Sequence, residues 1–129
     1  MDLWNALFSY RVSHQRTSLT RDESLCAYAR ERVKEHVERL KTLSSDQEPL
    51  DAHAGFKRDA DSGALFEKTG FPAVSENLAY LPDSRTATQI IEWGWDTSTS
   101  HREAQLSNEW THGCVVGTRP FYVGLFARR

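Results

Sequence analysis

The residue pattern changes in kind along this 129-residue chain, and that change constrains the fold more than any other feature. The first part repeats apolar residues every three or four positions, which predicts amphipathic helices over Leu3–His14 and Asp22–Lys41. The last part is β-rich, because Cys114–Val116 and Phe121–Phe126 flank the turn-like Gly117–Pro120, and this predicts an antiparallel hairpin. Helices come first and paired strands last, so we expect the α+β class rather than alternating βαβ units.

The middle of the chain is broken by glycine and proline into shorter elements. Their patterns predict a short helix over Ala60–Lys68, a strand over Val74–Leu81, a helix over Arg85–Asp96 and a helical turn over His101–Ser107. Thr20 and Glu23 have the spacing of a capping box, which predicts Thr20 as the N-cap of the second helix.

Length and composition limit the class of protein. The length is typical of a single domain, and we expect one domain over residues 1–129. The chain is 39% hydrophobic and 11% aromatic, which argues against disorder. The net charge of −2 lacks the basic excess of a nucleic-acid binder, so we expect no nucleic-acid partner. There is no run of 18 apolar residues and no signal peptide, so the chain is either cytosolic or a domain whose signal or anchor has been removed.

Three polar positions stand out as candidates for chemistry. His53 lies in an irregular segment, Glu76 interrupts an otherwise apolar stretch, and His101 follows a run of serine and threonine. A carboxylate in a buried strand is costly unless it is paired or ligates a metal. Each position also suits an ordinary role as a hydrogen-bonded histidine, a capping glutamate or a solvated loop residue. The residues alone leave both interpretations open.

Several motifs, taken in order, resemble the bacterial branch of the CAP superfamily, the cysteine-rich secretory protein, antigen 5 and pathogenesis-related-1 proteins (SCP-like domains). They are the opening around Asn5 and Arg11, His53–Phe56, Ser75–Tyr80, Trp95–Arg102, and the two C-terminal strands. The resemblance covers nearly the whole chain. It implies a three-layer α-β-α sandwich in which a small antiparallel sheet lies between helices.

The chain departs from the family pattern at three places. Ser75 stands where the family usually has glycine, and Thr99-Ser100 replaces a Pro-Gly pair. Many members have a tetrad of two histidines and two glutamates, and the second glutamate falls at Ser98 here. The full tetrad is therefore absent.

The resemblance implies one cleft that carries the chemistry. His53, Glu76 and His101 match family positions there and are ligand types that zinc accepts with an open position left for water. We expect zinc rather than calcium as the divalent ion, because calcium takes six to eight oxygen ligands. The same cleft is expected to be supported by Asn77, Ser98 and Arg102.

Several functions are compatible with such a cleft. We expect an exported, secreted or cell-surface binding domain without catalysis, whose partner is a protein, a lipid or a small molecule. The main alternative is a metal-dependent hydrolase of peptide or ester bonds that uses the same three residues. A serine hydrolase built from Ser98 or Ser100 beside His101 is disfavoured, because the chain has no G-x-S-x-G elbow.

The two cysteines form no CxxC motif. Cys26 lies near the buried face of the second predicted helix and Cys114 in the penultimate strand, a placement that suits either a disulfide or two buried thiols. The secretory habit of the resembled family favours a Cys26–Cys114 disulfide. A disulfide would in turn favour an exported location.

Overall fold

The computed structural model describes residues 3–83, 86–91 and 99–129, and for 99–101 it describes the backbone alone. Along the chain the elements are α1 (Leu3–Ser13), β1 (Thr20–Arg21), α2 (Glu23–Leu40), α3 (Ala54–Ser62), α4 (Ala64–Thr69), β2 (Ala73–Tyr80), α5 (Thr99–Leu106), β3 (His112–Thr118) and β4 (Phe121–Arg128). Residues 87–91 form a further helical turn. None of the helices in these residues has both the length and the apolar character needed to cross a membrane.

The sheet has the strand order β1-β3-β4-β2. β4 pairs antiparallel with both β3 and β2. This confirms the predicted hairpin, and β2 confirms the strand predicted over Val74–Leu81. The three long strands form the expected small antiparallel sheet, and the two-residue β1 adds a parallel pairing with β3 at its edge. The chain runs along β3 before α2 begins, and the Thr20 amide donates to the Thr111 carbonyl at 2.9 Å. Thr20 therefore belongs to a strand, and the N-cap of α2 is Asp22, whose carboxylate accepts from the Leu25 amide.

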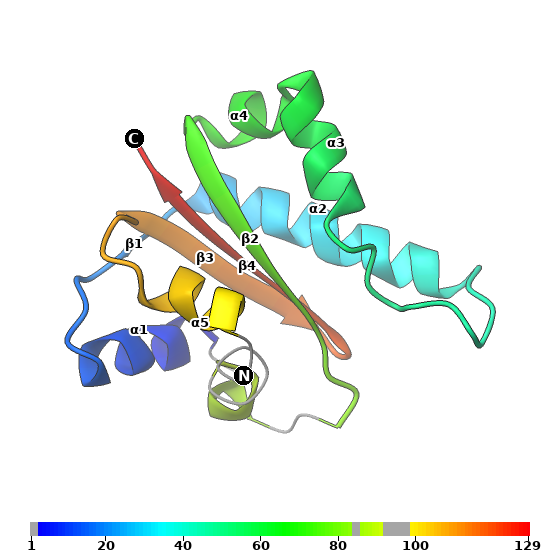
Figure 1. Ribbon diagram of the computed structural model, residues 1–129, viewed down its shortest axis with the longest axis horizontal. Coiled ribbons are helices and arrows are strands. Elements are labelled where there is room, and N and C mark those ends of the chain that lie inside the picture. The colour runs from blue at the N-terminus through cyan, green and yellow to red at the C-terminus, as the bar shows by residue number, and fades with distance from the viewer. Residues whose placement is uncertain (1–2, 84–85, 92–98) are drawn as a thin grey trace.

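The sheet separates two groups of helices, which confirms the α-β-α layering. Figure 1 shows the strands running diagonally between α2, α3 and α4 on one side and α1 and α5 on the other. Side chains of β4 alternate between the two layers. Those of Phe121, Val123, Leu125 and Ala127 join the core under α2, and those of Tyr122 and Phe126 join the core over α1 and α5.

The helices α1, α2 and α5 confirm the predicted elements, but the short helix predicted over Ala60–Lys68 is wrong. The chain instead forms α3 and α4, which meet at Gly63. Gly63 has φ of 84°, a left-handed conformation that ends one helix and that glycine adopts without steric cost. Of the helix predicted over Arg85–Asp96, only residues 87–91 fall within the described helical part.

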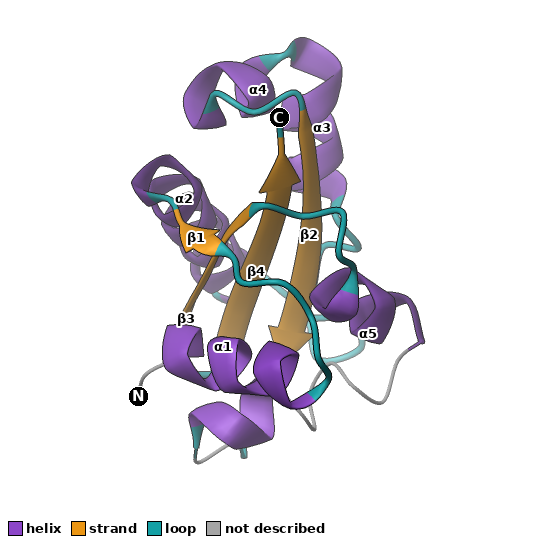
Figure 2. Cartoon of the chain, turned by 90° about the vertical axis from the view of Figure 1, so that its left-hand side faces the viewer, coloured by secondary structure: helices purple, strands orange, loops and turns teal. Residues whose placement is uncertain are grey.

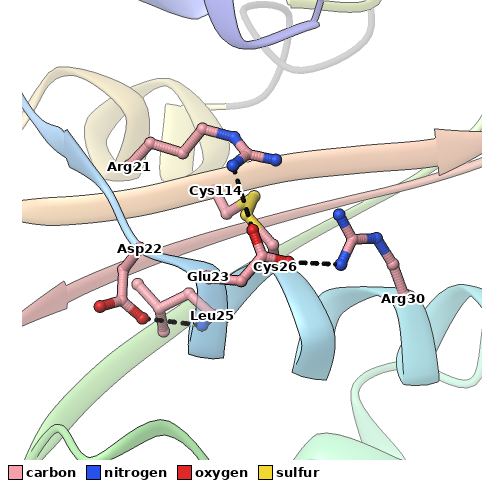
Figure 3. Close-up of a disulfide and its surroundings, with 7 residues drawn as sticks. All are labelled: Arg21, Asp22, Glu23, Leu25, Cys26, Arg30 and Cys114. Carbon is pink, nitrogen blue, oxygen red and sulfur yellow. Dashed lines mark hydrogen bonds and ion pairs between the residues drawn. A yellow bond between two sulfur atoms is a disulfide. The ribbon is translucent and has the colours of Figure 1, made fainter.

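A disulfide joins α2 to β3. Cys26 and Cys114 are both fully buried, with an S–S distance of 2.04 Å and Cα atoms 5.2 Å apart. Figure 3 shows the bond between the first turns of α2 and the strand behind it, beside the surface ion pairs that Glu23 makes with Arg21 and Arg30. The predicted Cys26–Cys114 pairing is confirmed, and it fixes α2 against the sheet.

Candidate functional site

A positively charged side chain lies inside the core on the buried face of α2. Arg32 is 0% exposed and occurs seven residues after Leu25, in register with Ala29 and His36 on the buried stripe. Its five N–H groups all donate hydrogen bonds to carboxylates. The acceptors are Glu76 Oε2 at 2.7 Å and Oε1 at 3.2 Å, Asp51 Oδ1 at 3.0 Å and Oδ2 at 2.9 Å, and Glu35 Oε2 at 3.2 Å.

Glu76 is one of the carboxylates that neutralise this guanidinium. It lies on β2, two residues before Leu78, so its side chain points to the α2 side of the sheet. The Glu76 side chain is 0% exposed. Oε2 accepts from Arg32, and Oε1 accepts from both Arg32 and His53 Nδ1, the latter at 3.0 Å. The costly buried carboxylate noted in the sequence is therefore paired and fully hydrogen-bonded.

Asp51, whose side chain is 13% exposed, is the second carboxylate partner of Arg32. Burial by itself would raise the pKa of Asp51, but the hydrogen bonds from Arg32 and from the Gly55 amide hold that pKa well below its usual value. His36 lies beside it, 1% exposed, and its Nδ1–H donates to the Arg32 carbonyl at 2.8 Å. His36 Nε2 then accepts from the Asp51 amide at 3.3 Å. The two residues hold the loop before α3 against α2.

His53 is the part of this cluster that reaches solvent. It precedes α3 with a left-handed φ of 66°, and its side chain is 43% exposed. Because a carboxylate only accepts, His53 Nδ1 carries the proton that it shares with Glu76, and Nε2 is the ring nitrogen left for a ligand. The hydrogen bond with Glu76 raises the pKa of His53 above its usual value.

The close approach of α3 to α2 explains why the His53–Phe56 motif has glycine at position 55. A Cβ atom there would overlap the Arg32 guanidinium and lie 2.6 Å from Glu35 Oε2, so only glycine allows α3 to start this close to α2. The Gly55 amide also donates to Asp51 Oδ2 at 3.1 Å. Phe56, next along, packs on the core and lies edge-on to Tyr28.

The other predicted site residues are placed as follows. His101 lies in α5, on the other side of the sheet from His53, and only its backbone is described. Figure 2 shows α3 near the upper end of the edge strand β2 and α5 beside its lower end. Asn77 is buried and alternates with Glu76, so its side chain points to the α5 side. Arg102 is exposed on α5 beside Arg16 and Glu103. Ser98 lies outside the described residues.

The geometry brings together His53 and Glu76 but does not suit Glu76 as a metal ligand. Both Glu76 oxygens already accept hydrogen bonds, and the Arg32 guanidinium takes the place beside them that a cation would need. Within the described part of the chain, no three His, Cys, Asp or Glu side chains are grouped to hold a metal. Among the described residues of this cluster, His53 Nε2 is the atom left for a metal, with Glu76 behind the ring as the hydrogen-bond acceptor of Nδ1.

Sequence reasoning missed Arg32, Asp51 and His36. The signal for two of them was present, because Arg32 and His36 fall on the same helical stripe as Leu25 and Ala29. A charged residue on a buried stripe indicates a buried ionic partner. For Asp51 we find no comparable local signal.

Comparison with known proteins rests on three-dimensional structure. No family model and no curated protein sequence matches the chain. A cysteine-rich secretory protein of Staphylococcus aureus matches over 98% of this chain with a TM-score of 0.71 and 18% identity. An extracellular protein of Bacillus anthracis that contains an SCP domain matches over 98% with a TM-score of 0.65 and 20% identity. The fold is that of an SCP domain.

The extent of the match differs among these structures. An outer surface protein of Borrelia burgdorferi has a TM-score of 0.70 and 20% identity, and the match covers 98% of this chain and 90% of that one. The chain spans only 37% of the Staphylococcus protein and 39% of the Bacillus protein. The recognised resemblance is thus supported as a shared fold, while the identities are low enough that side-chain roles must be argued from this chain's own geometry.

Proposed function

We propose that this SCP domain is an exported binding module whose contact point is His53. The observation that carries the proposal is the position of the His53 ring: Nδ1 is held by a fully buried carboxylate, and the half-exposed ring leaves Nε2 for a ligand. The ligand is a protein, a lipid or a small molecule.

The proposal includes a bound divalent metal ion, for which zinc is favoured over calcium. His53 would bind it through Nε2, and His101 is the second proposed ligand, which requires its side chain to reach past the edge strand β2. Glu76 would act behind His53, as carboxylates commonly do behind metal-bound histidines by fixing the ring and its tautomer. Bound there, zinc would supply an open coordination position for a ligand's oxygen or nitrogen.

The alternative is the metal-dependent hydrolase. It requires Glu76 to take a proton from water or substrate, as a general base in direct contact with it. Glu76 is 0% exposed and accepts from Arg32 and His53 with both oxygens, so this geometry favours binding over hydrolysis.

The proposed export has two supports. The structurally similar proteins are described as secretory, extracellular and outer-surface proteins. The Cys26–Cys114 disulfide is a bond that forms and persists in oxidising compartments.

Isothermal titration of the chain with Zn²⁺ and Ca²⁺ tests the contact point. We expect zinc to bind the wild type, to bind His53→Ala at least tenfold more weakly, and to bind Glu76→Gln about 10- to 100-fold more weakly. His14→Ala is the matched control, because His14 is a partly exposed histidine bonded to its own helix carbonyl at Tyr10.

Equal zinc affinity for the wild type and His53→Ala would remove His53 from the site. A panel of peptide and ester substrates, assayed with zinc and then with a chelator, tests the alternative. Chelator-sensitive turnover that disappears in Glu76→Gln even at zinc concentrations that saturate the variant would establish the hydrolase in place of the binding module.

A further inference from the structure

One guanidinium joins three separate parts of the chain around His53. Arg32 from α2 donates to Asp51 in the loop before α3 and to Glu76 on β2. His53 follows Asp51 by two residues and bonds to Glu76. Both ends of the histidine, its backbone and its ring, are therefore held by residues that Arg32 holds.

The backbone at His53 requires such support. Ala52 and His53 both have left-handed φ angles, 53° and 66°, which non-glycine residues rarely adopt. Backbone outliers of this kind persist only where the surroundings enforce them, and they concentrate at functional sites. Here Asp51 supplies the enforcement, since its carboxylate binds Arg32 through two oxygens and also accepts from the Gly55 amide.

The ring of His53 depends on Arg32 as well. Glu76 is buried, and Arg32 donates to each of its oxygens, which fixes the carboxylate plane. The fixed Oε1 accepts from His53 Nδ1, and in a neutral imidazole the proton on one nitrogen determines that the other is an acceptor. Arg32 thus acts through Glu76 to leave the Nε2 lone pair outward.

We propose that Arg32 is the positioning residue of the His53 site: it selects the Nδ1–H tautomer through Glu76 and the left-handed loop through Asp51, without touching the ligand. That this arrangement serves ligand binding at His53 rests on the proposed function. Its existence does not, because the tautomer is a property of the ligand-free protein. A lysine cannot replace it, because an ammonium lacks the planar fork that serves two carboxylates at once.

The test is the tautomer of His53 in the full chain without metal or ligand. Long-range ¹H–¹⁵N NMR of histidine-labelled protein at alkaline pH, where the ring is neutral, distinguishes Nδ1–H from Nε2–H. We expect the wild type to show the Nδ1–H form alone and Arg32→Lys and Arg32→Met to show a mixture. Glu76→Gln should show the same loss, because it removes the charged acceptor.

Arg58→Lys is the matched control. Arg58 is also an arginine that bonds to carboxylates, those of Glu35 and Asp59, but it is exposed and does not contact Glu76 or Asp51. It should keep the wild-type tautomer. A role of Arg32 confined to stability would lower the melting temperature of Arg32→Lys and leave its His53 tautomer unchanged.

The possible outcomes separate this inference from the proposed function. If Arg32→Met does not fold, Arg32→Lys and Glu76→Gln decide. An unchanged Nδ1–H tautomer in either of these folded variants overturns the inference, whatever zinc does. A lost tautomer preference together with no zinc binding to the wild type would overturn the metal proposal and leave the positioning role of Arg32 intact.

Discussion

Two arginines are buried on opposite faces of the same sheet, and their surroundings differ. Arg32, on the buried face of α2, donates every side-chain N–H group to a carboxylate. Arg11, in α1 and 2% exposed, donates to the carbonyls of Thr17, Gln105 and Ser107 and to the Thr17 hydroxyl. One charge is neutralised by opposite charges, and the other by backbone dipoles.

The difference has a physical basis in what each arginine connects. Arg11 links the C-terminal end of α5 to the loop after α1 by hydrogen bonds to their carbonyl groups. Carbonyl groups at the end of a helix carry partial negative charge and lack helical partners. Burial lowers the pKa of Arg11, and the nearby Arg16 lowers it further. Arg32 instead holds two acidic side chains, the buried Glu76 and the largely buried Asp51, and Glu76 in turn holds His53. The carbonyl-bound arginine is structural, while the carboxylate-bound one leads to the candidate site.

The largest expected effect comes from removing each arginine in turn. Arg32→Met leaves Glu76 and Asp51 buried without their counter-charge, so we expect a loss of about 3–5 kcal/mol in unfolding free energy. Arg11→Met leaves uncharged backbone carbonyls and one hydroxyl without their donor, and we expect a loss of about 1.5–3 kcal/mol. Urea denaturation followed by tryptophan fluorescence measures both. An equal or larger loss in Arg11→Met would show that carboxylate partners do not make Arg32 contribute more to stability than Arg11.

A smaller effect is expected from Gly55→Ala, which tests how tightly the Arg32 region is packed. The new methyl group overlaps the Arg32 guanidinium, and we expect a loss of about 1–3 kcal/mol from overpacking. Gly63→Ala is the control: no atom lies within 4 Å of its added Cβ, so the cost there is only that of φ 84°, about 1–2 kcal/mol. The two losses come from different sources, and only Gly55→Ala should also disturb the His53 tautomer. An undisturbed His53 in a folded Gly55→Ala protein would contradict the close packing of this region.

The smallest expected effect is a pH dependence confined to one of the two regions. The folded pKa of Asp51 is lowered, so its contribution to stability is present above its unfolded pKa of about 3.9 and is lost as pH falls through the folded value. The destabilisation caused by Arg32→Met should therefore shrink by about 1 kcal/mol on acidification below pH about 4.

Arg11 has no carboxylate partner among the hydrogen bonds found in the described residues. The loss caused by Arg11→Met should stay constant over the same acid range. Denaturant midpoints measured at several pH values compare the two variants. A parallel decline in both would mean that the acid sensitivity does not arise at Asp51.

The fold was largely predictable because its main elements are written in local periodicity. The apolar spacing in α1 and α2 and the β-rich end of the chain each specify an element without reference to the rest. The division of α3 from α4 was missed because one left-handed glycine, Gly63, separates two helices that look like loop and helix in sequence. The parallel β1 was missed because two residues are too few to show a strand pattern.

The candidate site was predictable only in part, for a different reason. His53 and Glu76 were named from motif resemblance, and the structure brings them together. The placement of Glu76 as the acceptor behind His53 depends on Arg32, which is 44 residues away along the chain. No local spacing encodes a partnership over that distance.

By itself, the sequence determined the α+β class, the order of helices and strands and the positions of the two cysteines, since these follow from local patterns of apolar and β-forming residues. Only the tertiary structure decided that the cysteines pair, that Arg32 enters the core and that His53 Nδ1 bonds to Glu76. Each of these depends on which side chains from distant parts of the chain come into contact. A buried charge is tolerated only where such a contact provides a group of opposite charge.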